Sequence, residues 1–489
     1  MDGNQDVGGF TGFVNYYVNL KACYSSGYVD NGVYIGGFVG ITDGHSYSAT
    51  QCYWDTESSG RATSVLGTGK TTAQLKQQNY GSEWDFDNTW WMEAGQTRPL
   101  LRSARKQRIF TAHHLQLMTV DLASEYQIMR DLDLSCLQNP ADVWGTSETS
   151  GSGFVPIGDN SNPFTGSLDG TDFAIDGLYI NRGSSSSYNG LFGKTSGATI
   201  SNLSSTNGFV NGYWYTGGLI GKADNSTINQ CYCEGTIFIS YYGGGLIGHV
   251  TNNSLIEKSS SAGIIHSWAK QIGGFVGKHE NSIIRNCYSR THVVNHGSLV
   301  YFGAFIGTGG SAPTIEKCYA TGSVTREGGT NPTGQGFAAT IDGSYCSDNF
   351  FDTESTGQSV GNGATGKTTA EMKNIDTFTD IATVGLTNTW DFTDIWEMYA
   401  GFNDGYPYLQ WQFAAPIAPA VPQNVIISIA NGEVTITWDE VSGATSYKVY
   451  SSATPDGDFT EETGGTFNGT SWSKQSADPK KFYLVKAVN

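Results

Sequence analysis

A four-residue word that ends in glycine recurs along this chain at nearly constant intervals. Its final glycine stands at positions 193, 221, 248, 277 and 307, so successive copies lie 28, 27, 29 and 30 residues apart. A decayed copy follows at 336–339, and two more copies, at 9–12 and 37–40, are 28 residues apart. Such a period is typical of repeat architectures, in which each unit buries its apolar face against its neighbours.

A second word, which carries cysteine, follows the first. It reads Ile-Asn-Gln-Cys-Tyr at 228–232, Ile-Arg-Asn-Cys-Tyr at 284–288 and Ile-Glu-Lys-Cys-Tyr at 315–319. Ser259 and Leu203 replace the cysteine in two other copies, and none of the eight cysteines of the chain forms a Cys-x-x-Cys pair. Exchange of Cys with Ser or Leu suits a small buried position better than a disulfide or a metal ligand.

Short alternating runs between glycine and asparagine turns, such as Thr-Ile-Phe-Ile at 236–239, predict strands rather than helices. We therefore expect an all-β fold, a parallel β-helix-like solenoid whose coils stack at about 4.8 Å. Identical repeat positions then lie above one another, so the Phe or Leu of the first word and the Cys of the second form internal ladders. Glycines serve corners that need a positive φ or a close backbone approach.

The first word resembles the GLUG motif, named for its Gly-Leu-any-Gly core, over roughly residues 8–60 and 188–360. Proteins with this motif include bacterial surface adhesins and the N-terminal parts of some immunoglobulin-A peptidases. The resemblance implies a β-helix-like solenoid outside a bacterial cell. It does not imply the peptidase activity, because His279-Glu280 is followed by Ile283 where the zinc motif H-E-x-x-H needs a second histidine.

A longer pattern, found once after each repeat array, predicts a C-terminal cap. The first copy holds Asp55, Glu57 and Thr-Gly-Lys-Thr-Thr-Ala at 68–73, and the second holds Asp352, Glu354 and the same six residues at 365–370. Tryptophans and a proline close both copies. We expect residues 1–103 to be the C-terminal part of one solenoid module, and residues 108–412 to be a complete second module with both caps.

The start of the second module follows a different pattern. Apolar residues between Thr111 and Met129 have the spacing of one or two short amphipathic helices, and Asp-Leu-Asp-Leu-Ser at 131–135 predicts a first strand. Beyond a Pro/Ala linker at 413–422, residues 423–489 resemble a fibronectin type III domain with Trp438 and Tyr447 in its second and third strands. The last strand of that sandwich is missing, through truncation or because a neighbouring molecule fills the open edge.

Charge and hydropathy narrow the functional classes. Lys plus Arg is 27 and Asp plus Glu is 45, and the resulting net charge of −18 argues against a nucleic-acid partner. The sequence contains no run of about 18 apolar residues, so no transmembrane segment is predicted. The first residues lack the features of a signal peptide, which suggests a fragment whose export signal lay upstream. The predicted location is the bacterial cell surface or the extracellular space.

Clustered aromatic residues are the candidate ligand-binding site. Tyr213, Trp214, Tyr215, Tyr241 and Tyr242 precede the glycine word in adjacent repeats, where their rings could form an outer ridge that contacts sugars. The alternative is that these side chains pack against one another across strands.

Carboxylates are candidates for a cation site or for catalysis. Asp159, Asp169, Asp172 and Asp176 suit calcium by chemistry, but the preferred interpretation is turn formation. The recurring pairs Asp55 with Glu57 and Asp352 with Glu354 could act as acid and base. One pair per cap favours hydrogen bonds to their own turns, so no catalytic residue and no cofactor is assigned.

These features together predict a non-enzymatic surface protein, an adhesin or rigid stalk that presents weak contacts to a cell-surface glycan or protein at fixed spacing. A subunit of an extracellular filament or sheath, joined through the open edge of the last domain, is one alternative. A polysaccharide lyase or hydrolase built on a β-helix is the other.

Overall fold

The computed structural model describes residues 6–147, 151–183, 186–297, 301–413, 421–441, 444, 446–455, 457–475 and 481–488. The chain divides into two compact units, Met1–Tyr408 and Leu409–Asn489. The first unit contains both expected solenoid modules except residues 409–412, which fall in the second unit.

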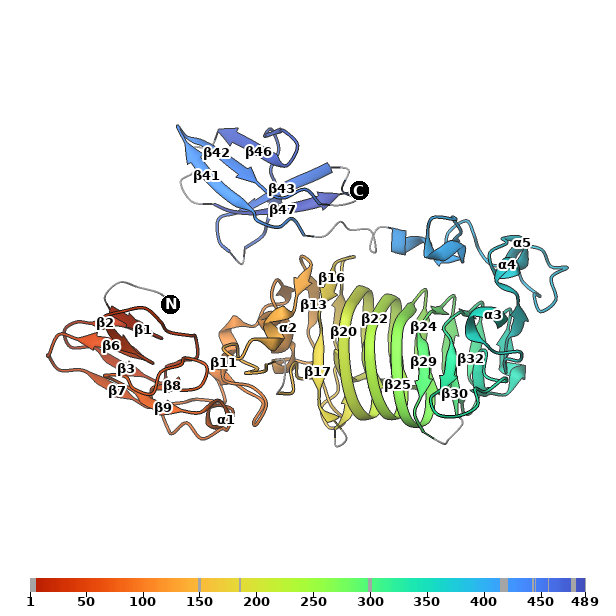
Figure 1. Ribbon diagram of the computed structural model, residues 1–489, viewed down its shortest axis with the longest axis horizontal. Helices are drawn as coiled ribbons and strands as arrows, with labels where there is room; N and C mark the ends of the chain where they lie inside the picture. The colour runs from red at the N-terminus through yellow and green to blue at the C-terminus, as the bar shows by residue number, and fades with distance from the viewer. Residues whose placement is uncertain are drawn as a thin grey trace. The chain divides into compact units, whose positions relative to one another are not determined.

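Successive repeats of the first unit form the stacked coils of a β-solenoid, as predicted (Figure 1). Three long strands, β20 Thr199–Gly217, β22 Thr227–Gly244 and β25 Ser260–Gly273, pair in parallel, one repeat apart. Ile200 pairs with Ile228, and Leu203 pairs with Cys231. The period of the sequence is therefore the length of one coil.

The glycine words build one face of this solenoid, a six-stranded parallel sheet. Its strands are β19 Phe192–Ser196, β21 Ile220–Asp224, β23 Ile247–Thr251, β26 Val276–His279, β31 Ile306–Gly309 and β35 Ala338–Thr340. The decayed copy supplies the last of these strands, so this sheet ends where the word loses its final glycine.

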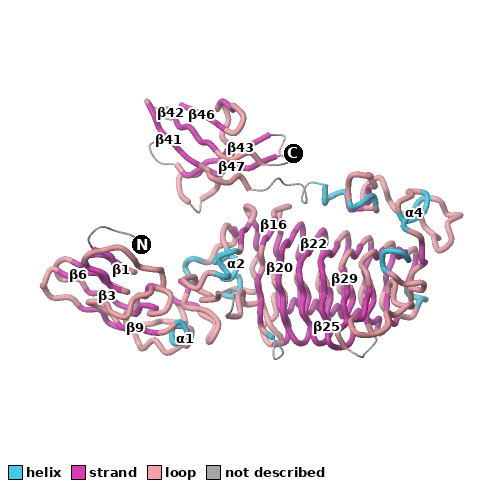
Figure 2. Tube along the Cα trace, in the orientation of Figure 1, coloured by secondary structure: helices cyan, strands magenta, loops and turns pink. Residues whose placement is uncertain are grey.

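A continuous parallel sheet of short and long strands completes the coils of the main module (Figure 2). Besides β20, β22 and β25 it contains β12 Arg108–Ile109, β13 Glu125–Ile128, β14 Leu132–Asp133, β15 Ser167–Asp169, β16 Ala174–Asp176, β17 Tyr179–Asn181, β18 Ser187–Asn189, β24 Leu255–Glu257, β27 Ile283–Arg285, β28 Tyr288–Ser289, β29 His292–Asn295, β30 Phe302–Gly303, β32 Thr314–Glu316, β33 Tyr319–Ala320, β34 Val324–Arg326, β36 Cys346–Ser347, β37 Phe350–Asp352 and β38 Thr365–Lys367.

The N-terminal module repeats this arrangement on a smaller scale, with parallel pairs one repeat apart. Its strands are β1 Asp6–Gly8, β2 Thr11–Val14, β3 Asn19–Lys21, β4 Tyr24–Ser25, β5 Tyr34–Gly36, β6 Val39–Thr42, β7 Ser48–Thr50, β8 Tyr53–Asp55, β9 Thr68–Lys70, β10 Trp90–Trp91 and β11 Leu100–Leu101.

The predicted internal ladders are present. Phe275, Phe305 and Phe337 are fully buried and stack with ring centroids 4.8 Å apart. In the second ladder Leu203, Cys231, Ser259, Cys287 and Cys318 are all fully buried. All eight cysteines lie within the described residues, and each is a free thiol. The cysteines of the repeat therefore act as small buried side chains.

The glycines of the first word lie where the backbone of a neighbouring coil comes close, which is one of the two roles expected for them. Residues other than glycine adopt the left-handed conformation just before the ladder cysteine or its substitute. These residues are Asn202, Gln230, Lys258, Asn286 and Lys317, with φ between 48° and 53°. Asparagine tolerates this region, whereas glutamine and lysine adopt it rarely. Their conformation is imposed by stacking against neighbouring coils.

Replacement of a glycine of the first word by alanine is expected to destabilise the solenoid. In Gly248→Ala the new Cβ would lie 2.6 Å from the Gly221 carbonyl oxygen and 2.7 Å from the Thr216 nitrogen. Both are backbone atoms, so the coil must shift, at a cost of about 1–3 kcal/mol. Urea unfolding followed by circular dichroism measures the loss. Gly27→Ala is the control, since no heavy atom lies within 4 Å of its Cβ. Equal midpoints for the two variants would contradict the prediction.

The two caps share their local structure. The helices α1 Thr72–Leu75 and α4 Thr369–Met372 each begin with a capping box, built by Thr71 with Gln74 and by Thr368 with Glu371. In each cap a tryptophan indole donates to a backbone carbonyl of the last coils, Trp84 to residue 51 and Trp390 to residue 348. The remaining cap elements are α3 Thr353–Thr356, α5 Asp376–Thr379, β39 Trp396–Glu397, β40 Tyr408–Leu409, η5 Gly343–Tyr345, η6 Asn403–Gly405 and η7 Gln410–Phe413.

The start of the main module was predicted only in part. The helical segment consists of α2 Ala112–Gln116 and the 3₁₀ helix η2 Leu117–Val120, preceded by η1 Arg102–Ala104. The rest of the predicted helix is the strand β13. The segment expected to be the first strand, 131–135, contains only β14 and leads into the 3₁₀ helix η3 Ser135–Gln138. That expectation was wrong, because β12 and β13 already pair upstream of it.

The second unit consists of two small antiparallel sheets. One contains β41 Ile426–Ala430, β42 Glu433–Thr437, β45 Thr466–Phe467 and β46 Ser471–Gln475, and the other contains β43 Ser446–Ser452, β44 Thr460–Glu461 and β47 Phe482–Val488. Both contribute to one core, formed by Val434, Ile436, Trp438, Val449, Trp472 and Val485. Within the described ranges, no helix has the length and apolar composition that a transmembrane span requires.

Candidate functional site

The aromatic residues predicted to form a ridge lie together at the ends of β20 and β22. Trp214 stacks on Tyr241 with ring centroids 4.7 Å apart, and Tyr215 stacks on Tyr242 at 5.2 Å, both with an interplanar angle of 14°. Tyr213 contacts Tyr241 edge to face at 5.4 Å. All five side chains are half-buried. The structure thus assembles the predicted group, and stacking between coils covers part of each ring face.

This stack continues beyond the five predicted residues. Tyr188, in β18, stacks on Tyr215 with ring centroids 5.1 Å apart, and His249, in β23, also stacks on Tyr215 at 5.5 Å. Tyr188, Tyr215 and Tyr242 each have a positive φ, of 64°, 50° and 52°. A bulky residue seldom adopts this conformation, so the neighbouring coils hold these tyrosines in place. We call Tyr188, Tyr215 and Tyr242 the tyrosine column.

A column of basic side chains runs beside the tyrosine column. Lys194, Lys222, His249 and Lys278 pair successively across four adjacent strands of the six-stranded sheet. The ammonium of Lys222 lies 5.7 Å from the ring centroid of Tyr215, and that of Lys278 lies 5.7 Å from that of Tyr242. Each basic residue directly follows the last glycine of a first word, so the sequence contained a signal that our sequence analysis missed.

Burial and mutual repulsion govern the ionisation of this column. Burial lowers the pKa of Lys222, and the nearby charge of Lys194 lowers it further. Burial lowers the pKa of His249 to about 4, so this imidazole is neutral near pH 7. Glu280 lies 2.8 Å from the His249 Nε2 and 3.0 Å from the Lys278 ammonium. Burial alone would raise the pKa of Glu280, but these two hydrogen bonds hold it below its usual value.

A second exterior stack involves residues that were not predicted. It runs along the coils through Tyr179, Phe209, Phe238, His266, Trp268 and His296. The Trp268 side chain stacks on His296 at 4.7 Å and remains 52% exposed. Different residue types occupy this stack in successive coils. No repeated sequence motif therefore marks it, and it could not be predicted from the repeats.

The recurring carboxylate pairs form hydrogen bonds to their own turns, which is the interpretation preferred from the sequence. Oδ1 of Asp55 accepts the backbone N–H groups of Glu57 and Ser58 at 2.9 and 3.1 Å. Asp352 accepts those of Glu354 and Ser355 at 2.8 and 3.0 Å. The second carboxylate of each pair accepts the N–H of the first residue of the cap helix. Both carboxylates of each pair are therefore engaged by backbone groups of their own cap.

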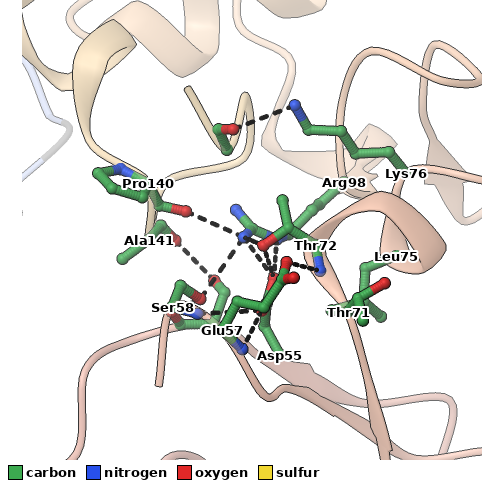
Figure 3. A network of polar contacts seen from close by, with 12 residues as sticks. Asp55, Glu57, Ser58, Thr71, Thr72, Leu75, Lys76, Arg98, Pro140 and Ala141 are labelled. Carbon is green, nitrogen blue, oxygen red and sulfur yellow. Dashed lines mark hydrogen bonds and ion pairs between the residues drawn. The ribbon is translucent and has the colours of Figure 1, made fainter. Parts of the chain in front are cut away.

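Asp55 also forms the centre of a polar network that joins the first cap to the main module (Figure 3). Both Asp55 and Arg98 have fully buried side chains, and Oδ2 of Asp55 accepts Nη2 and Nε of Arg98 at 2.5 and 3.1 Å. The guanidinium also donates to the carbonyl oxygens of Pro140 and Asp142, beyond η3. One arginine thus binds the cap carboxylate and the backbone of the next module.

Three of the acidic residues considered for calcium accept hydrogen bonds from their own turns or from the next coil. Asp159 accepts the N–H groups of Ser161 and Asn162, both at 2.7 Å, and Asp169 accepts that of Thr171 at 2.9 Å. Asp176 accepts the Thr206 hydroxyl at 2.6 Å. Within the described parts of the chain, no group of three or more His, Cys, Asp or Glu residues could hold a metal ion. Asp159 and Asp169 thus stabilise their own turns, and Asp176 joins two neighbouring coils.

Comparisons with known proteins give distant relatives. No family model matches the chain. Halomucin of Haloquadratum walsbyi is 30% identical over 348 residues, which is 68% of this chain and 4% of halomucin. A protein of Evansella cellulosilytica, provisionally named a Gly-rich membrane protein, is 35% identical over 105 residues, or 21% of this chain and 11% of that protein. The chain thus spans only a small part of the length of the relatives it matches.

A solved structure from Bacteroides ovatus, provisionally described as an immunoglobulin A1 protease, aligns with a TM-score of 0.36 and 16% identity over 62% of this chain and 92% of that chain. On its own strand pairing and on the sequence comparison, the present chain is a β-solenoid protein distantly related to halomucin.

Proposed function

We propose that this chain is part of a bacterial surface or extracellular rod that adheres to glycans through the aromatic side chains on its coils. The observation that carries the proposal is the group Trp214, Tyr215, Tyr241 and Tyr242, stacked and half-buried on two adjacent coils. Tyrosine and tryptophan combine a large apolar surface with a hydrogen-bonding group, which suits contact with sugars. Half-exposed aromatics in register offer several equivalent weak contacts.

The solenoid gives such contacts a fixed spacing. Neighbouring coils hold corresponding side chains at the distance between paired strands, about 4.8 Å. Weak contacts held on one rigid scaffold bind together with an avidity above that of any single contact. The relative named as a membrane protein supports a location at the cell envelope, and the GLUG resemblance supports an adhesin role.

We expect the double variant Trp214→Ala, Tyr241→Ala to bind polysaccharides at least tenfold more weakly, since aromatic side chains commonly dominate binding energy. Binding of the purified full chain to a polysaccharide panel and to whole cells tests this, with released sugar measured in the same samples. Tyr17→Ala is the control, because its side chain is 81% exposed and lies in the N-terminal module. Unchanged binding by the double variant would rule out the ridge, and released sugar would favour a polysaccharide lyase or hydrolase.

A second candidate function is a subunit of an extracellular filament. Among the described strands, β47 pairs with β43 alone, so one of its edges is open. In the other sheet, β41 is likewise an end strand, and its Ile427 and Ile429 pair with the buried Ile436 and Val434 yet remain 46% and 68% exposed. A strand added by a neighbour would use such an edge. Sedimentation of the full chain over a range of concentrations tests this, and a concentration-independent monomer would oppose it.

A further inference from the structure

Two cysteines face each other across adjacent coils of the N-terminal module. The strands β4 and β8 pair in parallel, with Tyr24 opposite Tyr53, and the Tyr53 N–H donates to the Cys23 carbonyl oxygen at 2.9 Å. Cys23 and Cys52 directly precede these tyrosines, so they occupy the same position in two successive coils. Paired strands lie about 4.8 Å apart, and a disulfide joins Cα atoms about 4.4–6.8 Å apart. The backbone thus holds this pair at a distance that a disulfide can span.

The two thiols also contact each other inside the module. Each side chain lies within hydrogen-bond distance of the other. The Cys23 thiol donates to the Lys21 carbonyl oxygen at 3.1 Å. The Cys52 thiol donates to that of Thr50 at 3.6 Å, and Thr50 is the partner of Lys21 across the coils. Because both thiols lie at equivalent points of the two coils, a bond between them requires no change in strand register.

The other six cysteines lack this combination of a facing thiol and access. Cys231, for example, has Leu203 and Ser259 at the same position of the neighbouring coils. Cys287 and Cys318 do contact each other, but both are fully buried, so a dissolved oxidant cannot reach them in the folded chain. In the N-terminal pair the first cysteine is only half-buried. That pair therefore combines contact with access.

The pair lies in the coil of the N-terminal module that has the fewest neighbours. Among the described strands, β1, β2, β3 and β4 each pair only with the equivalent strand of the next coil. Phe10 stacks on the buried Phe38 with ring centroids 4.8 Å apart, yet it remains 43% exposed. A coil of a solenoid is stabilised by its neighbours, so one with a single described neighbour separates more readily. A covalent link to the next coil opposes that separation, because it restricts the unfolded chain.

Exchange with a small disulfide can close the pair. The Cys23 thiol loses its proton and attacks one sulfur of oxidised glutathione, which releases the first glutathione thiolate. The Cys52 thiolate then attacks the Cys23 sulfur of the mixed disulfide, and the second glutathione leaves. Two protein thiols are thereby oxidised to one disulfide, and one glutathione disulfide is reduced to two thiols. Burial raises the pKa of Cys23, and that of Cys52 to about 11, so the exchange is faster at alkaline pH.

We propose that Cys23 and Cys52 form a disulfide that joins the first two described coils of the N-terminal module, with a low-molecular-weight disulfide as the oxidant. Disulfides persist in oxidising surroundings such as the extracellular space. The inference therefore rests on the extracellular location in the proposed function, and it is independent of glycan binding. It adds a site of covalent modification that stabilises one end of the rod.

Mass spectrometry of the full chain tests the proposal. The folded, reduced chain is incubated with oxidised glutathione at about pH 8.5, the ordinary pKa of a cysteine, then quenched with acid, unfolded and labelled with N-ethylmaleimide. Both cysteines lie on the tryptic peptide 22–61, which contains no other cysteine. We expect this peptide to have lost two hydrogens and to carry no label. Without glutathione treatment it should carry a label on each cysteine.

Cys52→Ser is the matched control, because Ser259 shows that serine fits this position of the repeat. In this variant peptide 22–61 should carry one maleimide or one glutathione and should never lose two hydrogens. Oxidation of the unaltered chain should also slow proteolysis of the N-terminal module by at least about tenfold, since cleavage follows the population of opened coils. The same treatment should leave the proteolysis of Cys52→Ser unchanged.

The possible failures are distinguishable. Two labels or two glutathiones on peptide 22–61 of the treated, unaltered chain would overturn the proposal, because the thiols then fail to join. A disulfide that forms without slowing proteolysis would refute its role in holding the coils together. Both readouts are made without a glycan, so a failure here leaves the glycan proposal standing. Failure of that proposal appears instead in the binding of the Trp214→Ala, Tyr241→Ala variant.

Discussion

Arg98→Ala is expected to lower the free energy of unfolding of the module junction by about 3–5 kcal/mol. The substitution leaves the Asp55 carboxylate fully buried without the cation that neutralises it. It also removes the donors to the carbonyl oxygens of Pro140 and Asp142. Urea unfolding measured by tryptophan fluorescence should show an earlier first transition, and limited proteolysis should cleave the segment after η3 faster.

Two further variants separate charge loss from junction loss. In the second cap Tyr406 takes the place of Arg98, and its hydroxyl donates to Asp352 at 2.6 Å. Arg98→Tyr should therefore satisfy Asp55 in part but still free the next module, which gives intermediate stability and full sensitivity to proteolysis. Arg285→Gln removes a partly exposed pair with Glu257 and should cost at most about 1 kcal/mol. Equal losses for the Arg98→Ala and Arg285→Gln variants would contradict a special role for the junction.

The lysine that follows the cap helix also differs between the two caps. Lys76 is buried, its ammonium donates to the Gly145 carbonyl oxygen at 3.3 Å, and burial lowers its pKa to about 8. Lys373, at the matching position of the second cap, is exposed and lies 4.8 Å from the Tyr406 ring centroid. The two caps thus share their fold but differ at the residue before the proline. Arg98 binds Asp55 and the backbone of the next module, whereas Tyr406 binds Asp352.

The features that could be predicted from the sequence are those that repeat. Phe275 and Phe305 occupy the same place in successive words, and parallel pairing one repeat apart places repeated positions above one another. The aromatic group at 213–215 and 241–242 was found because it recurs beside the glycine word. The basic column recurs just as regularly, one residue after the last glycine of each first word, so the sequence also contains the information needed to predict it.

Features that occur once were not predictable in this way. The partners of Arg98 are backbone carbonyls about 40 residues further along the chain, and a carbonyl has no signature in the sequence. One cavity is lined by both Gln96 and Arg182, from two modules whose docking no periodic pattern encodes. Gln230 and Lys258 adopt a backbone conformation that their residue types disfavour, so propensity alone points away from it.

His279→Val is expected to make the solenoid less sensitive to acid. His279 ends β26, is fully buried, and pairs with Val250 in one neighbouring coil and Gly309 in the other. Neither ring nitrogen has a hydrogen-bond partner among the described residues. Burial lowers the pKa of His279 to about 3, and the adjacent His249 lowers it further, while the nearby Ser282 backbone and Glu280 oppose this.

The sign follows from proton binding. An unfolded histidine takes up a proton below about pH 6.5, whereas the folded His279 stays neutral down to about pH 3. This histidine therefore leaves the free energy of unfolding unchanged above about pH 6.5. Below that pH it lowers the free energy of unfolding by about 1.4 kcal/mol per pH unit. Relative to the unaltered chain, His279→Val should therefore gain about 2–3 kcal/mol between pH 7.5 and pH 4.5.

Urea unfolding at the two pH values measures this gain, because any packing change caused by valine is present at both and cancels in the difference. The neighbouring Val250 shows that the coil accommodates valine at this position. His249, whose pKa burial lowers to about 4, leaves a residual acid sensitivity in the variant. His45→Gln, at a side chain 48% exposed, should keep the pH dependence of the unaltered chain. Parallel pH profiles for His279→Val and the unaltered chain would show that the buried imidazole does not control the acid stability of the solenoid.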